Sequence, residues 1–189
     1  ADKKEGELKL LFLSRVSEKK NLFFALQLLS NIEKKSALTF DIYGPVEDEA
    51  YWRKCLRLIE ELKSNGMSIN YFGAIQNNKV AETIRPYHFL LLPTLNENYG
   101  HVIVESFLNG KPVIISDQTP WRNLEKSNSG WDIPLNNISK FDSVINDCMK
   151  MDNSKYNEML KSTLEYAEKN CNPEDSILGT KKMFNDIIK

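Results

Sequence analysis

The chain has 189 residues, with 25 lysine and arginine residues against 26 aspartate and glutamate residues, and a net charge of −1. This length fits one domain with a core of ordinary size. The balanced charge argues against a nucleic-acid or anionic-membrane surface, and the absence of any run near 18 apolar residues argues against a transmembrane segment.

The cysteines and the first residues bear on compartment and boundaries. Cys55, Cys148 and Cys171 are far apart and form no CxxC pair, so we expect buried free thiols in a reducing cytoplasm. Residues 1–7, ADKKEGE, are polar and lack an initiating methionine. The sequence therefore predicts a disordered or artificial tail at 1–7, followed by one domain over 8–189 of what is expected to be a longer protein.

Strand and helix signals alternate along the chain. Short apolar runs bounded by turn residues predict strands at Leu8–Leu13, Thr39–Tyr43, Ile69–Phe72, Phe89–Leu92, Pro112–Ile115 and Gly130–Ile133. Apolar residues at helical spacing predict helices at Leu22–Ile32, Tyr51–Leu62, Asn77–Ile84, Gly100–Leu108, Ile138–Met151, Tyr156–Lys169 and Glu174–Ile188, with a single helical turn at Trp121–Glu125. The sequence therefore predicts a single α/β domain with a doubly wound, Rossmann-like parallel sheet.

The most informative stretch is FLLLPTLNENYGHVIVESFLNGKPVIISD, residues 89–117. It reads as a strand, a loop, a helix that begins near Gly100, and a second strand. Glu97 would precede the helix and Glu105 would project from its second turn. The free N–H groups at a helix start bind anions, and phosphate suits them. Two carboxylates beside a phosphate site indicate a nucleotide sugar, although glutamates at this spacing also arise by chance.

Two cations follow the first strand. Arg15 ends that strand and Lys20 opens the next helix, so both could reach one diphosphate. A lysine at a helix start opposes the helix dipole and needs an anionic partner. In parallel sheets ligands bind beyond the carboxyl ends of the strands, where the strand order reverses, so we expect these cations to lie beside Glu97 and Glu105.

Four motifs in this order carry a resemblance to a known family. They are FLSRVSEKKN, DIYGP, NYFGAI and PTLNENYGHVIVESFLNGKPVIISD, each at the end of an expected strand. Over nearly its full length the chain resembles the C-terminal, donor-binding domain of the retaining glycosyltransferases called glycosyl transferases group 1. The resemblance implies a fold that is the C-terminal half of the two-domain GT-B architecture.

The resemblance also implies roles for individual residues. Arg15 and Lys20 would hold the donor diphosphate, Glu97 would contact the donor sugar, and Glu105 would accept hydrogen bonds from the ribose. The remaining expected contacts are made mostly by backbone groups. The distal phosphate would be bound by the N–H groups around Tyr99, Gly100, His101 and Val102. The base would lie against the loop formed by Gly73, Ala74 and Ile75. We expect no metal and no cofactor beyond the donor substrate, because no Asp-x-Asp triplet is present.

Some positions depart from the family pattern. Ser14 and Asn21 stand where the family has glycine, and Tyr99 stands where it has phenylalanine. These are mild changes, since serine and asparagine suit turns. Asn123 stands where a glutamate is common, so the resemblance does not extend to donor-sugar contacts at 118–123. We expect Trp121 and His88 to be packing residues.

The resemblance implies a metal-independent, retaining transferase that moves a sugar from a nucleoside-diphosphate sugar to a glycan or lipid-linked acceptor, as in bacterial polysaccharide biosynthesis. The protein would be cytoplasmic, or peripheral to the inner membrane through an N-terminal domain. Without that domain we expect little transfer. A non-catalytic nucleotide-sugar-binding module, a phosphorylase or an epimerase on the same fold stay open. A receiver-type domain would need acidic residues after the first strand, where Ser14 and Arg15 stand.

Overall fold

The computed structural model describes residues 2–32 and 37–171, which fold around one six-stranded parallel sheet. The strands are β1 (Leu8–Leu13), β2 (Leu38–Tyr43), β3 (Ser68–Tyr71), β4 (Phe89–Leu92), β5 (Val113–Ser116) and β6 (Gly130–Ile133). The helices are α1 (Leu22–Ser30), α2 (Glu49–Ser64), α3 (Val80–Ile84), α4 (His101–Leu108), α5 (Ile138–Lys150) and α6 (Asn153–Asn170), with short 3-10 turns η1 (Glu18–Lys20) and η3 (Asn77–Lys79). The predicted helix Glu174–Ile188 lies outside the described residues.

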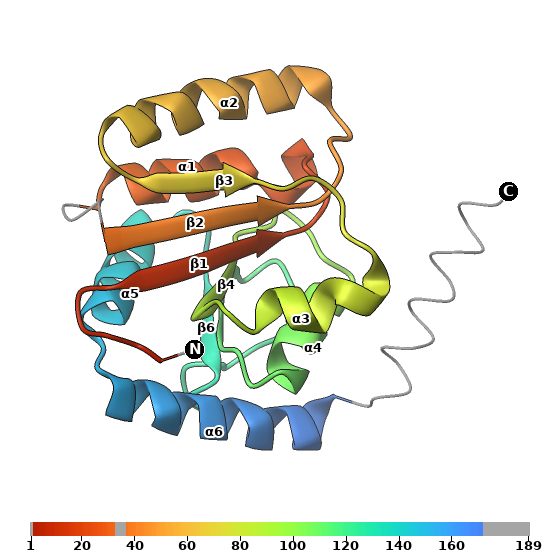
Figure 1. Ribbon diagram of the computed structural model, residues 1–189. Coiled ribbons are helices and arrows are strands. Elements are labelled where there is room, and N and C mark those ends of the chain that lie inside the picture. Colours follow the sequence, from red (N-terminus) through yellow and green to blue (C-terminus); the bar gives the residue numbers. More distant parts are fainter. Residues whose placement is uncertain (1, 33–36, 172–189) are drawn as a thin grey trace, which may run out of the picture.

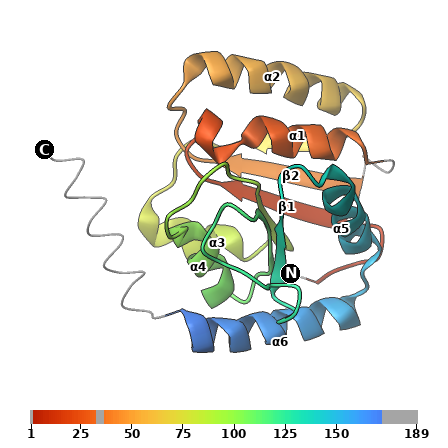
Figure 2. The same cartoon turned by 180° about the vertical axis from the view of Figure 1, so that it is seen from behind.

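Helices cover both faces of the sheet, as the doubly wound prediction requires. Figures 1 and 2 show α1 and α2 on one face and α3, α4 and α6 on the other. On the first face Phe24 of α1 packs edge-on against Phe141 of α5, with ring centroids 5.6 Å apart. On the second face Phe107 of α4 meets Tyr166 of α6 at 5.0 Å. Strands β4 and β5 are buried along their whole length, because both of their faces are covered.

The strand order fixes where a ligand can bind. The order is β3-β2-β1-β4-β5-β6, so β1 and β4 are neighbours although the chain visits two other strands between them. From β1 the chain runs to α1 on one face, and from β4 it runs to α4 on the other (Figure 1). The loops after β1 and β4 therefore diverge and leave a crevice at the carboxyl edge of the sheet.

One predicted helical turn is wrong. Residues 121–123 have no regular structure and residues 124–128 form turns. Asn123 has φ +57°, which interrupts helical hydrogen bonding, and the Asp132 carboxylate accepts from the backbone N–H groups of Asn123 and Leu124 at 3.2 and 2.9 Å. A side chain from β6 thus organises the segment.

Residues 2–7, where the sequence predicts a disordered or artificial tail, are held against the domain. Lys3 is buried, and its ammonium group donates to the carbonyls of Lys4, Met149 and Met151 at 2.8–3.3 Å. The N–H group of Gly6 donates to the same Met149 carbonyl at 2.8 Å. These bonds satisfy carbonyls at the end of α5, which a helix leaves without partners, so the segment is held as part of the fold.

His88 is a packing residue, as predicted. It is fully buried, its Nδ1 accepts from the backbone N–H of Lys9 at 3.0 Å, and its Nε2 lies 3.3 Å from the carbonyl of Asp2. Burial lowers the pKa of His88 to about 4. A neutral ring that accepts at one nitrogen joins the start of β1 to the start of β4.

Candidate functional site

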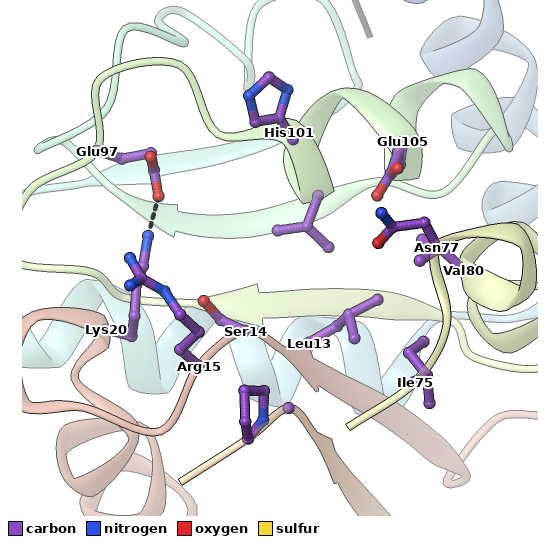
Figure 3. Close-up of a pocket in the computed structure, with 13 residues that line it drawn as sticks. Leu13, Ser14, Arg15, Lys20, Ile75, Asn77, Val80, Glu97, His101 and Glu105 are labelled. Carbon is purple, nitrogen blue, oxygen red and sulfur yellow. Dashed lines mark hydrogen bonds and ion pairs between the residues drawn. The ribbon is translucent and has the colours of Figure 1, made fainter. Parts of the chain in front are cut away.

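A cleft of about 260 Å³ opens at the carboxyl ends of β1 and β4, where the strand order reverses. Seven of the predicted site residues line it: Arg15, Lys20, Ile75, Glu97, His101, Val102 and Glu105. Figure 3 shows Arg15, Lys20 and Glu97 gathered at one end, and Glu105 with Ile75 at the other. The structure therefore brings together residues that are up to 90 positions apart in the chain.

The loops after β1 and β2 are joined, which places Arg15 at the cleft. Val16 donates its N–H to the carbonyl of Pro45 at 2.8 Å and accepts from Glu47 at 3.1 Å. Gly44 has φ +137°, and a Cβ there would lie 1.9 Å from the carbonyl oxygen of Ser14. Only glycine allows this approach. Arg15 consequently forms an ion pair with Glu47, and both side chains are about half exposed, at 51% and 42%.

Lys20 and Glu97 form the second ion pair of the cleft, and it is largely buried. Their side chains are 9% and 16% exposed. Three bonds tie the segment that carries Lys20 to the loop after β4: the N–H of Leu95 and the hydroxyl of Thr94 reach the carbonyl of Lys19 at 2.8 and 3.0 Å, and the Asn21 amide reaches the carbonyl of Pro93 at 2.9 Å. Asn21 has φ +60°, a conformation that asparagine tolerates where the family has glycine.

The start of α4 forms the wall between the two ends of the cleft. Gly100 has φ +80° and provides no side-chain cap, and its carbonyl takes the N–H groups of Ile103 and Val104 at 2.8 and 3.1 Å. The N–H groups of His101 and Val102 precede these bonds, where a helix supplies no acceptor, and they carry the positive end of its dipole. The arrangement suits an anion.

Packing holds this helix start in place. Trp121 is 8% exposed and packs edge-on against Phe107 with centroids 5.5 Å apart, as predicted for a packing residue. Its indole N–H donates to the carbonyl of Tyr99 at 2.6 Å. The Tyr99 ring lies 4.9 Å from the His101 ring. Nδ1 of His101 is buried and has no hydrogen-bond partner among the described residues.

Glu105 occupies the opposite end of the cleft without an ion-pair partner among the described residues. Burial raises the pKa of its carboxyl to about 7. In Figure 3 the carboxyl group points toward the amide of Asn77, and Val80 lies beside that residue. A half-buried carboxyl group for which the described residues supply no donor can accept hydrogen bonds from the hydroxyl groups of a ligand.

The remaining predicted residues lie close to the cleft without lining it. Tyr99 and Gly100 support the start of α4, as described above. Of the loop 73–75, only Ile75 lines the cleft, while Ala74 is exposed and the carbonyl of Gly73 accepts from the N–H of Gly44 at 2.7 Å. This bond holds the loops after β2 and β3 side by side.

The sequence prediction missed several lining residues. They are Leu13, Ser14, Gly44, Pro45, Asn77 and Val80. It also missed Glu47, the partner of Arg15. Their position was a usable signal, because Glu47 follows the turn after β2 and Asn77 follows the loop after β3, at the edge where ligands bind.

Two further observations concern metal and membrane. Within residues 2–32 and 37–171, no three His, Cys, Asp or Glu side chains lie together as a metal site would need, and all three cysteines are buried and free. No helix in that part of the chain is long and apolar enough to cross a bilayer.

The fold and the cleft define a Rossmann-like domain of the kind found as the C-terminal half of GT-B glycosyltransferases. The structure matches the C-terminal domain of LpcC, a group 1 glycosyl transferase of Francisella tularensis, with a TM-score of 0.74 at 12% identity over 90% of this chain and 89% of that one. The chain belongs to the family glycosyl transferases group 1, whose model matches residues 1–169.

Longer solved proteins share the fold. Anabaena HepE, in complex with UDP and glucose, matches with a TM-score of 0.71 at 15% identity over 96% of this chain and 49% of that one. The pneumococcal O-GlcNAc transferase GtfA, in complex with UDP and GlcNAc, gives 0.70 at 18% identity over 98% and 37%. This chain thus spans about half or less of their length. A search of curated proteins finds no match.

Proposed function

We propose that this chain is the donor-binding domain of a retaining, metal-independent glycosyltransferase that moves a sugar from a nucleoside-diphosphate sugar to a glycan or lipid-linked acceptor. The observation that carries the proposal is the meeting of Arg15, Lys20, Glu97, Glu105 and the start of α4 in one cleft. The UDP complexes of HepE and GtfA support a nucleotide-sugar donor.

The order of groups along the cleft matches the order of groups in such a donor. The diphosphate would lie between Arg15, Lys20 and the N–H groups of His101 and Val102, with the sugar toward Glu97. The ribose would meet Glu105, and the base would lie beyond it against Ile75. Arginine provides a planar fork for phosphate oxygens and lysine a compact charge.

The chemistry follows from where charge develops. Breaking the bond between the sugar and the diphosphate leaves positive charge on the sugar ring and negative charge on the leaving group. Lys20, Arg15 and the start of α4 would stabilise the leaving group, and preorganised groups of this kind lower barriers strongly. Glu97 would stabilise the cationic ring or orient it, and the acceptor would attack from the face that the diphosphate leaves.

A second domain would bind the acceptor. Sites of this type lie between domains, and this chain spans about half or less of the longer relatives. We propose an N-terminal domain of the same polypeptide that binds the acceptor, and a cytoplasmic protein attached to the inner membrane through that domain. Residues 1–189 alone would transfer little sugar.

Nucleotide binding tests the proposal directly. We expect ligand-observed NMR on this chain to detect one of UDP, GDP and ADP or their sugar derivatives. Arg15→Ala should weaken every diphosphate ligand about tenfold, because a charged hydrogen bond is lost. Arg53→Ala, an exposed arginine on α2, should change nothing. Absence of binding by all nucleotides, or equal effects of the two variants, would contradict the proposal.

The pKa of Glu105 predicts a pH dependence. Ribose hydroxyls donate to a charged carboxylate, whereas Glu105 is half protonated near pH 7. The affinity for UDP-glucose, whose phosphates do not titrate near neutrality, should therefore fall about tenfold as the pH drops from 8 to 6. Titration calorimetry across this range measures the effect. In Glu105→Gln the affinity should be lower at pH 8 and nearly independent of pH.

The raised pKa of Glu105 also predicts that the stability of the protein falls as the pH rises, whereas the affinity for the donor rises. The carboxyl group of Glu105 has its ordinary pKa of about 4.5 in the unfolded chain and a pKa of about 7 in the folded chain. The folded chain therefore binds more protons between these two values. The free energy of unfolding consequently falls as the pH rises from about 4.5 to 7. Glu105→Gln should therefore be more stable than wild type at pH 8. A variant less stable than wild type at that pH would show that burial of the charged Glu105 carboxylate does not destabilise the fold.

A further inference from the structure

Arg15 and Lys20, the two cations that line the cleft, each have a carboxylate partner. Arg15 pairs with Glu47 at the exposed rim, and Lys20 pairs with Glu97 in the interior. Glu105 adds a third carboxyl group. The cleft proposed to bind a diphosphate is thus neutralised by its own side chains, and an incoming diphosphate has to compete with Glu97 for Lys20.

The two ion pairs differ in how much free energy is lost when a diphosphate displaces the carboxylate. Water can hydrate Glu47 when Arg15 turns to a phosphate, since both side chains are about half exposed. Glu97 is 16% exposed and Lys20 9%, so a carboxylate displaced there stays close to the diphosphate and is poorly hydrated. A charged group that loses its partner in such a place is strongly unfavourable.

The sugar of an intact donor removes this penalty. Sugar hydroxyl groups donate hydrogen bonds, and a carboxylate accepts at both oxygens. When the donor is bound, Glu97 can release Lys20 to the diphosphate and take hydroxyls instead. When only the nucleoside diphosphate is bound, no such donors are present and Glu97 faces an anion.

We propose that Glu97 makes the cleft discriminate between the donor and the nucleoside diphosphate product, by competing with the diphosphate for Lys20. After transfer, Glu97 pairs with Lys20 again and the product diphosphate leaves. This role is separate from any contact that Glu97 makes in the reaction itself. The inference rests on the proposed function, since it concerns the same cleft.

The test compares dissociation constants for UDP and UDP-glucose in this chain, with GDP and GDP-mannose or ADP and ADP-glucose as the pair if those nucleotides bind better. Glu97→Gln keeps the size of the side chain and removes its charge. We expect Glu97→Gln to bind the diphosphate about tenfold more tightly than wild type, because the competitor for Lys20 is gone. Its affinity for the sugar nucleotide should change little, since the amide keeps one acceptor for the hydroxyls.

Glu47→Gln is the matched control. It removes the same charge from the other ion pair, so it should tighten diphosphate and sugar nucleotide by the same small factor and leave their ratio unchanged. Glu97→Ala is a second variant that should also tighten diphosphate binding. Amide NMR spectra of the variants show whether each is folded.

The outcomes separate the two proposals. If no nucleotide binds wild type or any folded variant, the proposed function is wrong and this inference falls with it. If UDP and UDP-glucose bind but Glu97→Gln leaves their affinity ratio unchanged, only the inference is wrong. An equal change of the ratio in Glu47→Gln would also overturn it, because the effect would then belong to net charge.

Discussion

Replacing Lys20 with alanine is expected to slow sugar transfer by the full-length protein about a hundredfold to a thousandfold, the loss that follows removal of one preorganised group at a developing charge. Lys20 is the cation closest to the interior of the cleft, where low hydration makes its charge most effective. Product formation from a nucleotide sugar, measured at saturating donor, is the readout.

The neighbouring lysine is the control for this prediction. Lys19 is exposed, and its contribution to the site is made by its backbone carbonyl, which accepts from Leu95 and Thr94. Lys19→Ala removes one positive charge from the same segment and should transfer at the wild-type rate. Equal rates for the two alanine variants would show that Lys20 does not act on the leaving group.

Replacing Gly44 with alanine should destabilise the protein by about 3 kcal/mol or more, as expected for a severe steric conflict in a tight backbone approach. The new Cβ would lie 1.9 Å from the Ser14 carbonyl oxygen and 2.5 Å from its carbon. The loops after β1 and β2 would have to separate, which breaks the bonds of Val16 to Pro45 and Glu47. Urea denaturation measures the loss.

Gly66→Ala separates this conflict from ordinary backbone strain. Gly66 also has a positive φ, at +91°, but a Cβ there would meet nothing within 4 Å. Its replacement should cost about 1 kcal/mol, the price of the left-handed conformation alone. If both alanine variants lose the same amount, the close approach at Ser14 does not hold the loops together.

Short apolar runs for the strands and apolar residues at helical spacing for the helices were enough to predict the architecture. Strands such as Leu8–Leu13 and Phe89–Leu92 were predicted with their observed bounds, because a fully buried strand is a short, continuous apolar run. The segment 121–128 could not be predicted in this way. Its shape depends on the Asp132 carboxylate of β6, and contacts of that kind have no local signature.

The candidate site was predicted from the rule that parallel strands meet at one edge. That rule predicts that Arg15, Lys20, Glu97 and Glu105 lie close together, and in the structure these four residues line one cleft. It could not show which charges pair. The pairing of Lys20 with Glu97 depends on bonds such as that from Asn21 to Pro93, which join two loops 72 residues apart. Sequence motifs predict which side chains form a site, whereas the distances between its loops determine which of these side chains form ion pairs.

The anchoring of Lys3 has a practical consequence for experiments. Its ammonium group is held by carbonyls at the end of α5, so Asp2 lies at the amino ends of β1 and β4, away from the cleft at their carboxyl ends. A biotin attached ahead of Asp2 would tether the molecule with its cleft turned toward the flowing solution. Immobilisation from this end would therefore suit surface-based sensors and affinity columns that present soluble sugar nucleotides.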